Sequence, residues 1–170
     1  MEIRSARPGD VEAVVPMVEK ICALHKSWDV AKFGFVDDVA GMYRGWLTRR
    51  ADDPQSVFLV AAAPDRLAGF LIGTVEQSIP IYRIKQFGFI HDLWVDEEYR
   101  HEGIGRQLTT VAIERFAALG VQQIRLDTAA DNDAARSLFA ACGFRPSATE
   151  MLLEVGGAPD RTPLDESSEI

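Results

Sequence analysis

The chain has 170 residues, of which 47% are hydrophobic and 26% charged, and its formal net charge is −8 at pH 7. This length and balance are typical of one globular domain with its own core. A net negative charge argues against generic nucleic-acid binding, and no apolar run approaches the roughly 20 residues that a membrane helix needs. We therefore expect no nucleic-acid partner and no membrane partner.

The first half of the chain predicts a strand, two helices and an antiparallel pair of strands. Apolar residues at helical spacing indicate the helices, the second of which Asp37 or Asp38 is expected to cap. Two apolar runs on either side of the turn Pro64–Asp65–Arg66 indicate the strand pair. These elements are expected over residues 3–6, 11–26, 38–50, 57–63 and 67–76.

The second half predicts strands and helices in alternation, so the whole fold is expected to be α+β with helices flanking a sheet. The elements are expected over residues 87–95 (strand), 103–119 (helix), 123–128 (strand), 132–143 (helix) and 151–155 (strand). Residues 156–170 are rich in Gly, Pro, Ser and acidic residues and predict a mobile tail. The single domain is therefore expected to span residues 1–155.

The two cysteines, Cys22 and Cys142, are too few for a disulfide framework, and their spacing fits no metal motif. We expect both to be small buried residues in a reducing, cytoplasmic setting. No metal site is expected.

A glycine-containing turn joins the strand 87–95 to the helix 103–119. Its sequence is Tyr99-Arg100-His101-Glu102-Gly103-Ile104-Gly105-Arg106. Such a turn presents unpaired backbone N–H groups at the positive end of the helix dipole, which predicts an anion site suited to pyrophosphate. A dinucleotide fingerprint is disfavoured because Leu108 stands where a third glycine is required, and the chain contains no Gly-Lys-Ser/Thr of a P-loop.

Two further segments accompany this turn. The preceding strand carries Ile90-His91-Asp92-Leu93-Trp94-Val95, and the last helix carries Asp131-Asn132-Asp133-Ala134-Ala135-Arg136-Ser137-Leu138-Phe139-Ala140-Ala141-Cys142-Gly143-Phe144. With these three motifs in order, residues 1–155 resemble the GNAT superfamily of N-acetyltransferases. The resemblance implies an α+β (three-layer α/β) fold with a mixed, mostly antiparallel central sheet flanked by helices, and acetyl-CoA (coenzyme A) as the acyl donor.

The resemblance also implies which residues bind the cofactor. Backbone N–H groups of the turn would hold the pyrophosphate, namely those of His101, Glu102, Gly103, Ile104, Gly105 and Arg106. Main-chain groups of Leu93, Trp94 and Val95 would pair with the pantetheine arm, as a peptide pairs with a sheet edge. The candidates for contacts with phosphate or with the rest of the cofactor are Arg100, Arg106, Asn132, Arg136 and Phe139. A solvated arginine and a plain N-cap are the alternative interpretations of Arg136 and Asn132.

Acetyl transfer to an amine needs a base that takes the ammonium proton. His91 and Asp92 form an adjacent ionisable pair in an otherwise apolar strand. Strand alternation predicts that they point to opposite faces, His91 with Phe89, Leu93 and Val95, and Asp92 with Ile90 and Trp94. Similar polyamine acetyltransferases carry Glu-Asp here, which leaves open which residue accepts the proton. A hydrogen-bonded structural role in the sheet is the alternative for either residue.

Phe139 stands where the family often places a tyrosine that protonates the departing CoA thiolate. A thiol with a pKa of ~8.5 is a tolerable leaving group without an acid, so Phe139 does not exclude catalysis. Tyr82, Tyr99 and water are the alternative proton donors. Because no cysteine is well placed as a nucleophile, direct transfer in a ternary complex is expected.

In this fold the acceptor pocket is commonly walled by the loop between the first two helices and by the segment before the cofactor strand. The candidates there are Trp28, Asp29, Phe33 and Tyr82, although core packing is an alternative role for the aromatic residues. We expect a small cationic amine, polyamine- or aminoglycoside-like, as the acceptor, and a homodimer. Arg83 and Lys85 favour the alternative of amino-acid acceptors. Acetylation of protein N-termini, use of a different acyl donor, and an acyl-CoA-binding module with weak or lost catalysis also stay open.

Overall fold

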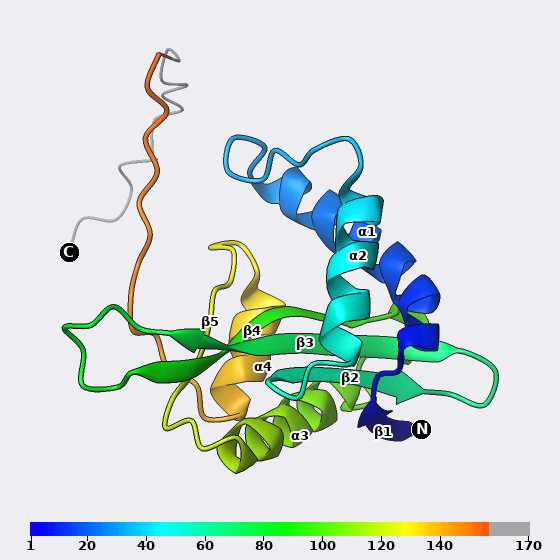
Figure 1. Cartoon of the computed structure of the whole chain (residues 1–170). Helices are drawn as coiled ribbons and strands as arrows, with labels where there is room; N and C mark the ends of the chain where they lie inside the picture. Colours follow the sequence, from blue (N-terminus) through cyan, green and yellow to red (C-terminus); the bar gives the residue numbers. More distant parts are fainter. Residues whose placement is uncertain (157–170) are drawn as a thin grey trace, which may run out of the picture.

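The computed structural model describes residues 1–156 and contains one five-stranded sheet in the order β1-β2-β3-β4-β5 (Figure 1). Neighbouring strands are antiparallel except β4 and β5, which are parallel. The strands are β1 (Glu2–Ser5), β2 (Ser56–Ala62), β3 (Leu67–Gln77), β4 (Gln86–Val95) and β5 (Ile124–Leu126). The helices are α1 (Val11–Trp28), α2 (Val39–Ala51), α3 (Ile104–Ala118) and α4 (Asp133–Ala141). The predicted α+β class and the mixed, mostly antiparallel sheet are confirmed.

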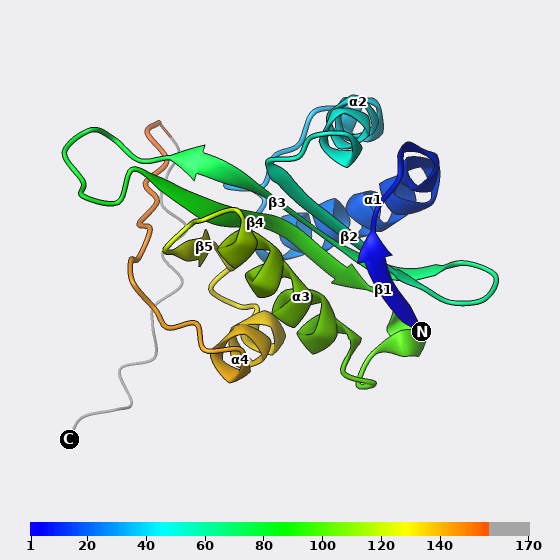
Figure 2. The same cartoon turned by 60° about the horizontal axis from the view of Figure 1, so that its bottom comes forward.

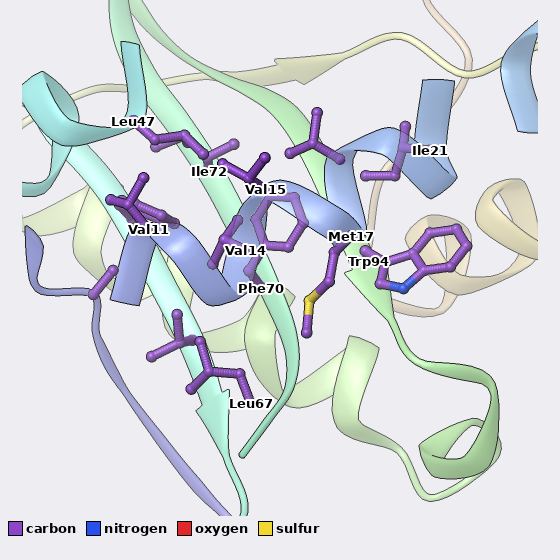
Figure 3. Packing of buried hydrophobic residues seen from close by; sticks show 14 of the residues in the cluster. Val11, Val14, Val15, Met17, Ile21, Leu47, Leu67, Phe70, Ile72 and Trp94 are labelled. Carbon is purple, nitrogen blue, oxygen red and sulfur yellow. The ribbon is translucent and has the colours of Figure 1, made fainter. Parts of the chain in front are cut away.

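The helices form a layer on each face of the sheet. Helices α1 and α2 lie on one face, and α3 and α4 lie on the other (Figures 1 and 2). The first core lies under α1 and α2, where Val14 and Leu47 are fully buried against Phe70 and Ile72 of β3 (Figure 3). Burying each such side chain contributes about 1.5–3 kcal/mol, which holds α1 and α2 to the sheet.

The second core lies under α3 and fixes the position of that helix. Phe116 is fully buried against the backbones of two glycines on neighbouring strands, Gly73 and Gly88. A Cβ atom at Gly88 would lie 2.6 Å from the ring of Phe116, and one at Gly73 would lie 2.8 Å from it. These glycines therefore make the groove that receives the ring.

The predicted caps are present at the helices that border the site. The Asp38 carboxylate accepts a hydrogen bond from the Gly41 N–H at 2.9 Å and begins α2. The Asn132 side chain accepts one from the Ala135 N–H at 3.1 Å and begins α4. Gly103 and Gly120 flank α3 with φ of 78° and 80°, in the left-handed region that favours glycine.

The C-terminal part of the sheet is smaller than predicted. Strand β5 has three residues instead of six, and the prediction of a strand over 151–155 is wrong, because within residues 1–156 this segment has no strand partner. Met151, Leu153 and Val155 are 88%, 85% and 96% exposed. Strand formation by such a run depends on a neighbouring strand that packs against it, and apolar composition does not replace one. Of the predicted tail, residues 157–170 lie outside the described residues.

Candidate functional site

A β-bulge in β4 determines where the predicted acid–base pair points. Ile72 of β3 pairs with Asp92, and the next residue, Gly73, pairs with Ile90, so His91 is an extra residue in β4. The side chain of His91 lies against Trp46 of α2, and that of Asp92 accepts a hydrogen bond from Tyr43 of the same helix. The prediction that the pair points to opposite faces is therefore wrong, because the bulge resets the alternation of the strand.

The bulge also corrects which neighbours share a face with the pair. Leu93 and Val95 pack in the core under α3, on the opposite face from His91. Ile90 lies in that same core, whereas Trp94 lies in the core under α1 and α2, on the side of Asp92. Both titratable side chains therefore face α2.

His91 lies in a partly enclosed polar and aromatic setting. Its Nε2 is 2.7 Å from the Thr74 Oγ1 and 3.7 Å from a carboxylate oxygen of Glu76. The Trp46 and Phe89 rings lie edge-on at 5.3 and 5.0 Å between centroids. Burial lowers the pKa of His91, the Glu76 carboxylate raises it, and the charge of Arg50 lowers it further. The imidazole is therefore neutral at neutral pH and able to accept a proton.

Asp92 is much more deeply buried, with 9% of its surface exposed. The hydroxyl of Tyr43 donates to its carboxylate at 3.2 Å. Burial raises the pKa of Asp92 to about 6, and the Tyr43 hydrogen bond opposes this rise. Burial and the charge of Asp92 raise the pKa of the Cys22 thiol to about 11. Cys22 is therefore a protonated thiol at neutral pH. The expectation of burial holds for Cys22, whereas Cys142 is only partly buried.

The predicted anion turn has the backbone conformation that such a site needs. His101 and Gly103 both have positive φ, 66° and 78°, directly before α3. A Cβ atom at Gly103 would meet nothing within 4 Å, so the backbone is open on that side. At Gly105 a Cβ atom would lie 3.2 Å from the Leu138 side chain, so this glycine also allows α3 to approach α4.

The edge of β4 beyond the bulge is open. Strand β5 pairs with Gly88–Ile90 of β4, and within residues 1–156 no strand covers that edge from His91 to Val95. The Val95 carbonyl accepts a hydrogen bond from the Arg100 Nε at 3.0 Å, and the Arg100 guanidinium lies 4.8 Å from the Trp94 ring centroid. Arg100 thus packs back onto the strand it follows.

The candidates on the last helix have structural partners. Arg136 donates to the Ala130 carbonyl and to Asp133, and Asn132 caps α4. Phe139 is 7% exposed, with its ring 5.5 Å from that of Phe144.

The acceptor candidates fall into two groups. Trp28 and Phe33 both contact His25, at ring distances of 5.4 and 4.7 Å, and burial lowers the pKa of His25. The Asp29 carboxylate accepts hydrogen bonds from the Ala31 and Lys32 N–H groups and so orders the loop after α1. Tyr82 lies in the β3–β4 connection and is 52% exposed.

Sequence reasoning missed several polar contacts of the site. Helical spacing puts Tyr43 and Trp46 on the apolar face of α2, and Thr74 and Glu76 are not among the predicted site residues. One available signal was the pair Thr74 and Glu76, two polar residues at strand spacing on one side of an apolar strand.

The model of the acetyltransferase (GNAT) family matches residues 22–144. The chain belongs to this family. Among the solved GNAT-like structures, a GCN5-related N-acetyltransferase from Ralstonia eutropha JMP134 superposes with a TM-score of 0.72 and 24% identity over 92% of this chain and 99% of that one. A mutant of a Bacillus halodurans protein superposes with a TM-score of 0.79 and 24% identity over 91% and 99%. The GNAT fold is confirmed.

Curated relatives match a smaller share of the chain. A mycothiol acetyltransferase from Nocardia farcinica is 31% identical over 117 residues, which are 65% of this chain and 37% of the relative. Human N-acetyltransferase 8 is 27% identical over 64% of this chain and 45% of its own length. The chain thus spans less than half the length of these two relatives. No helix within residues 1–156 is long and apolar enough to cross a membrane.

Proposed function

We propose that this GNAT protein transfers an acetyl group from acetyl-CoA to a primary amine. The observation that carries the proposal is the bulge in β4, which turns His91 and Asp92 to the same side beside the open edge of that strand. Family membership supports the reaction class. We propose residues 1–155 as the catalytic domain.

The residues present fit coenzyme A. The backbone at Gly103 is open to an approaching pyrophosphate, and α3 begins there with N–H groups that have no intrahelical partner. The uncovered edge of β4 leaves Leu93 and Trp94 for the pantetheine arm. A structural neighbour with a TM-score of 0.67 and 14% identity, an aminoglycoside N-acetyltransferase, was solved in complex with CoA. Arg106 is the proposed phosphate contact on α3, whereas Arg100 and Arg136 have partners within the fold.

Acetyl-CoA supplies an acetyl group already activated as a thioester. His91 or Asp92 takes the proton of the acceptor ammonium, directly or through water, and so frees the amine lone pair. Cys22 remains protonated and buried, which favours direct transfer over an acyl-cysteine. Phe139 has no proton to give, so Tyr82, Tyr99 and water are the candidate donors to the leaving thiolate; the Tyr99 hydroxyl accepts a hydrogen bond from Arg66 at 3.2 Å and keeps its own hydrogen.

We propose a small cationic amine as the acceptor. The net charge of −8 attracts cations, and the Glu76 carboxylate lies beside His91. The Lys32 ammonium lies 5.7 Å from the Phe33 ring centroid, so this loop already holds one cation over an aromatic face. The aminoglycoside acetyltransferases among the structural neighbours agree with such an acceptor. A homodimer stays a prediction.

An acceptor screen with detection of free CoA thiol tests this function. We expect turnover with polyamines or aminoglycosides, and a loss of about 10²–10⁴-fold in kcat when the base is removed by His91→Ala or Asp92→Ala. Thr48→Ala on the exposed face of α2 is the control and should keep full activity. CoA binding without turnover of any amine would favour the acyl-CoA-binding module. Full activity in both the His91 and the Asp92 variants would place the base elsewhere.

A further inference from the structure

We propose that Thr74 and Glu76 are positioning residues that hold His91 in one tautomer, with its Nδ1 as the proton acceptor. The proposal rests on the function proposed above and names the atom that performs its proton transfer. The three side chains come from neighbouring strands, Thr74 and Glu76 from β3 and His91 from the bulge of β4.

Their contacts form a continuous chain. The Thr74 hydroxyl lies 2.6 Å from the Glu76 Oε1 and 2.7 Å from the His91 Nε2. The Glu76 oxygen itself is 3.7 Å from Nε2 and is too far for a direct hydrogen bond. Thr74 therefore connects the imidazole to the carboxylate.

The number of available hydrogens determines which atoms donate and which accept in these two hydrogen bonds. The Thr74 hydroxyl has one hydrogen, and an ionised carboxylate can only accept, so the hydroxyl donates to Glu76. The hydroxyl oxygen then accepts from Nε2–H of His91, which leaves the lone pair of the neutral imidazole on Nδ1. The opposite tautomer would leave Nε2 and the Glu76 carboxylate competing for a single hydrogen.

The arrangement also suits the protonated state. When an acceptor ammonium loses its proton to Nδ1, an N–H bond of the ammonium breaks, an Nδ1–H bond forms, and the positive charge moves to the imidazolium. The Glu76 carboxylate on β3 stabilises that charge, Arg50 on α2 opposes it, and Asp92 is the neighbouring carboxylate on β4. Breaking the hydrogen-bond chain from Glu76 through Thr74 to His91 should therefore weaken His91 as a base.

NMR of ¹⁵N-labelled imidazoles tests the tautomer without any need for activity. The chain has three histidines, and loss of signals in His91→Gln assigns the pair that belongs to His91. We expect the Nε2–H tautomer in the wild type, and a lower titration midpoint with a mixed tautomer in Thr74→Val and Glu76→Gln. Glu76 is half exposed, so its variant folds even if the Thr74 variant does not. An Nδ1–H tautomer in the wild type, or no change in the Glu76 variant, would overturn the proposal.

The pH profile of kcat/KM is the second readout. In Thr74→Val and Glu76→Gln the acid limb should move to lower pH and the plateau should fall about tenfold. Thr74→Ser keeps the hydroxyl and should restore the wild-type profile, and Thr48→Val makes the same chemical change on the exposed face of α2 without effect. A wild type with the Nε2–H tautomer but no acetyl transfer would contradict the proposed function alone.

Discussion

At the scale of single residues, the buried carboxylate of Asp92 is a candidate base, but its burial lowers the stability of the folded protein. Its carboxylate is buried, and the described residues give it one hydrogen bond, from Tyr43 at 3.2 Å. The pKa near 6 means that the folded protein holds the proton of this group more tightly than the unfolded chain does. Stability from this group is therefore complete below pH ~4, where both states are protonated, and is lost as the pH rises toward 6.

Replacing Asp92 by the isosteric asparagine should remove this conflict. At pH 7.5 we expect Asp92→Asn to unfold at higher urea concentration than the wild type, by about 1–3 kcal/mol, because no charge has to be buried. At pH 4 the two proteins should have similar stability. Urea titrations at both pH values, with Asp37→Asn as an exposed control, measure the difference. A wild type that is more stable than the variant at pH 7.5 would show that the buried carboxylate is fully satisfied.

At the scale of elements, α3 begins and ends with the same backbone conformation but only one end faces the proposed cofactor. Gly103 and Gly120 have φ of 78° and 80°, and a Cβ atom at either would meet nothing within 4 Å. The two positions are therefore a matched pair in which strain is equal and only the position differs.

Alanine at each position separates strain from cofactor binding. Gly103→Ala and Gly120→Ala should each cost about 1 kcal/mol of stability, because both place a side chain at positive φ. Calorimetry should show an affinity for CoA that is reduced at least about tenfold in Gly103→Ala, because its Cβ obstructs the approach of pyrophosphate, and unchanged affinity in Gly120→Ala. Equal affinities in the two variants would move the phosphates away from this turn.

Elements and their order could be predicted from the sequence, whereas the details of the site could not. Helical spacing and turn residues located α1, α2 and α3, and the glycine turn was placed between its strand and helix. The bulge could not be predicted because β4 is covered on both faces. Its apolar residues lie on either face, so the polarity pattern does not show which face a residue occupies. The strand predicted over residues 151–155 is absent because apolar composition does not show whether a partner strand exists.

At the scale of the whole molecule, the net charge affects the rate at which the protein meets a charged acceptor more than it affects the stability of the fold. The chain carries 26 acidic residues against 18 Lys and Arg, which gives a field that attracts cations. The few described ion pairs around the site, such as Lys32 with Glu150, are exposed and add little stability.

Ionic strength should therefore distinguish cationic from neutral acceptors. Raising the salt from about 10 mM to about 300 mM should lower kcat/KM for a cationic amine several-fold, since screening shortens the range of the attraction. The kcat should change little, and a neutral amine of similar size serves as the control. Equal salt dependence for both acceptors, or none for the cationic one, would contradict steering by the acidic surface.

The bulge in β4 also determines what the insertion or deletion of one codon would do to this strand. Phe89 faces α2, Ile90 faces α3, and from Asp92 onward the same alternation resumes, so the sheet would be regular if His91 were absent. Loss of the His91 codon would remove one of the two proposed bases and leave the register of every other residue of β4 intact. Gain of one codon would do the reverse. A single three-nucleotide event at this position would therefore add or remove a proposed catalytic side chain without shifting the register of the neighbouring strand.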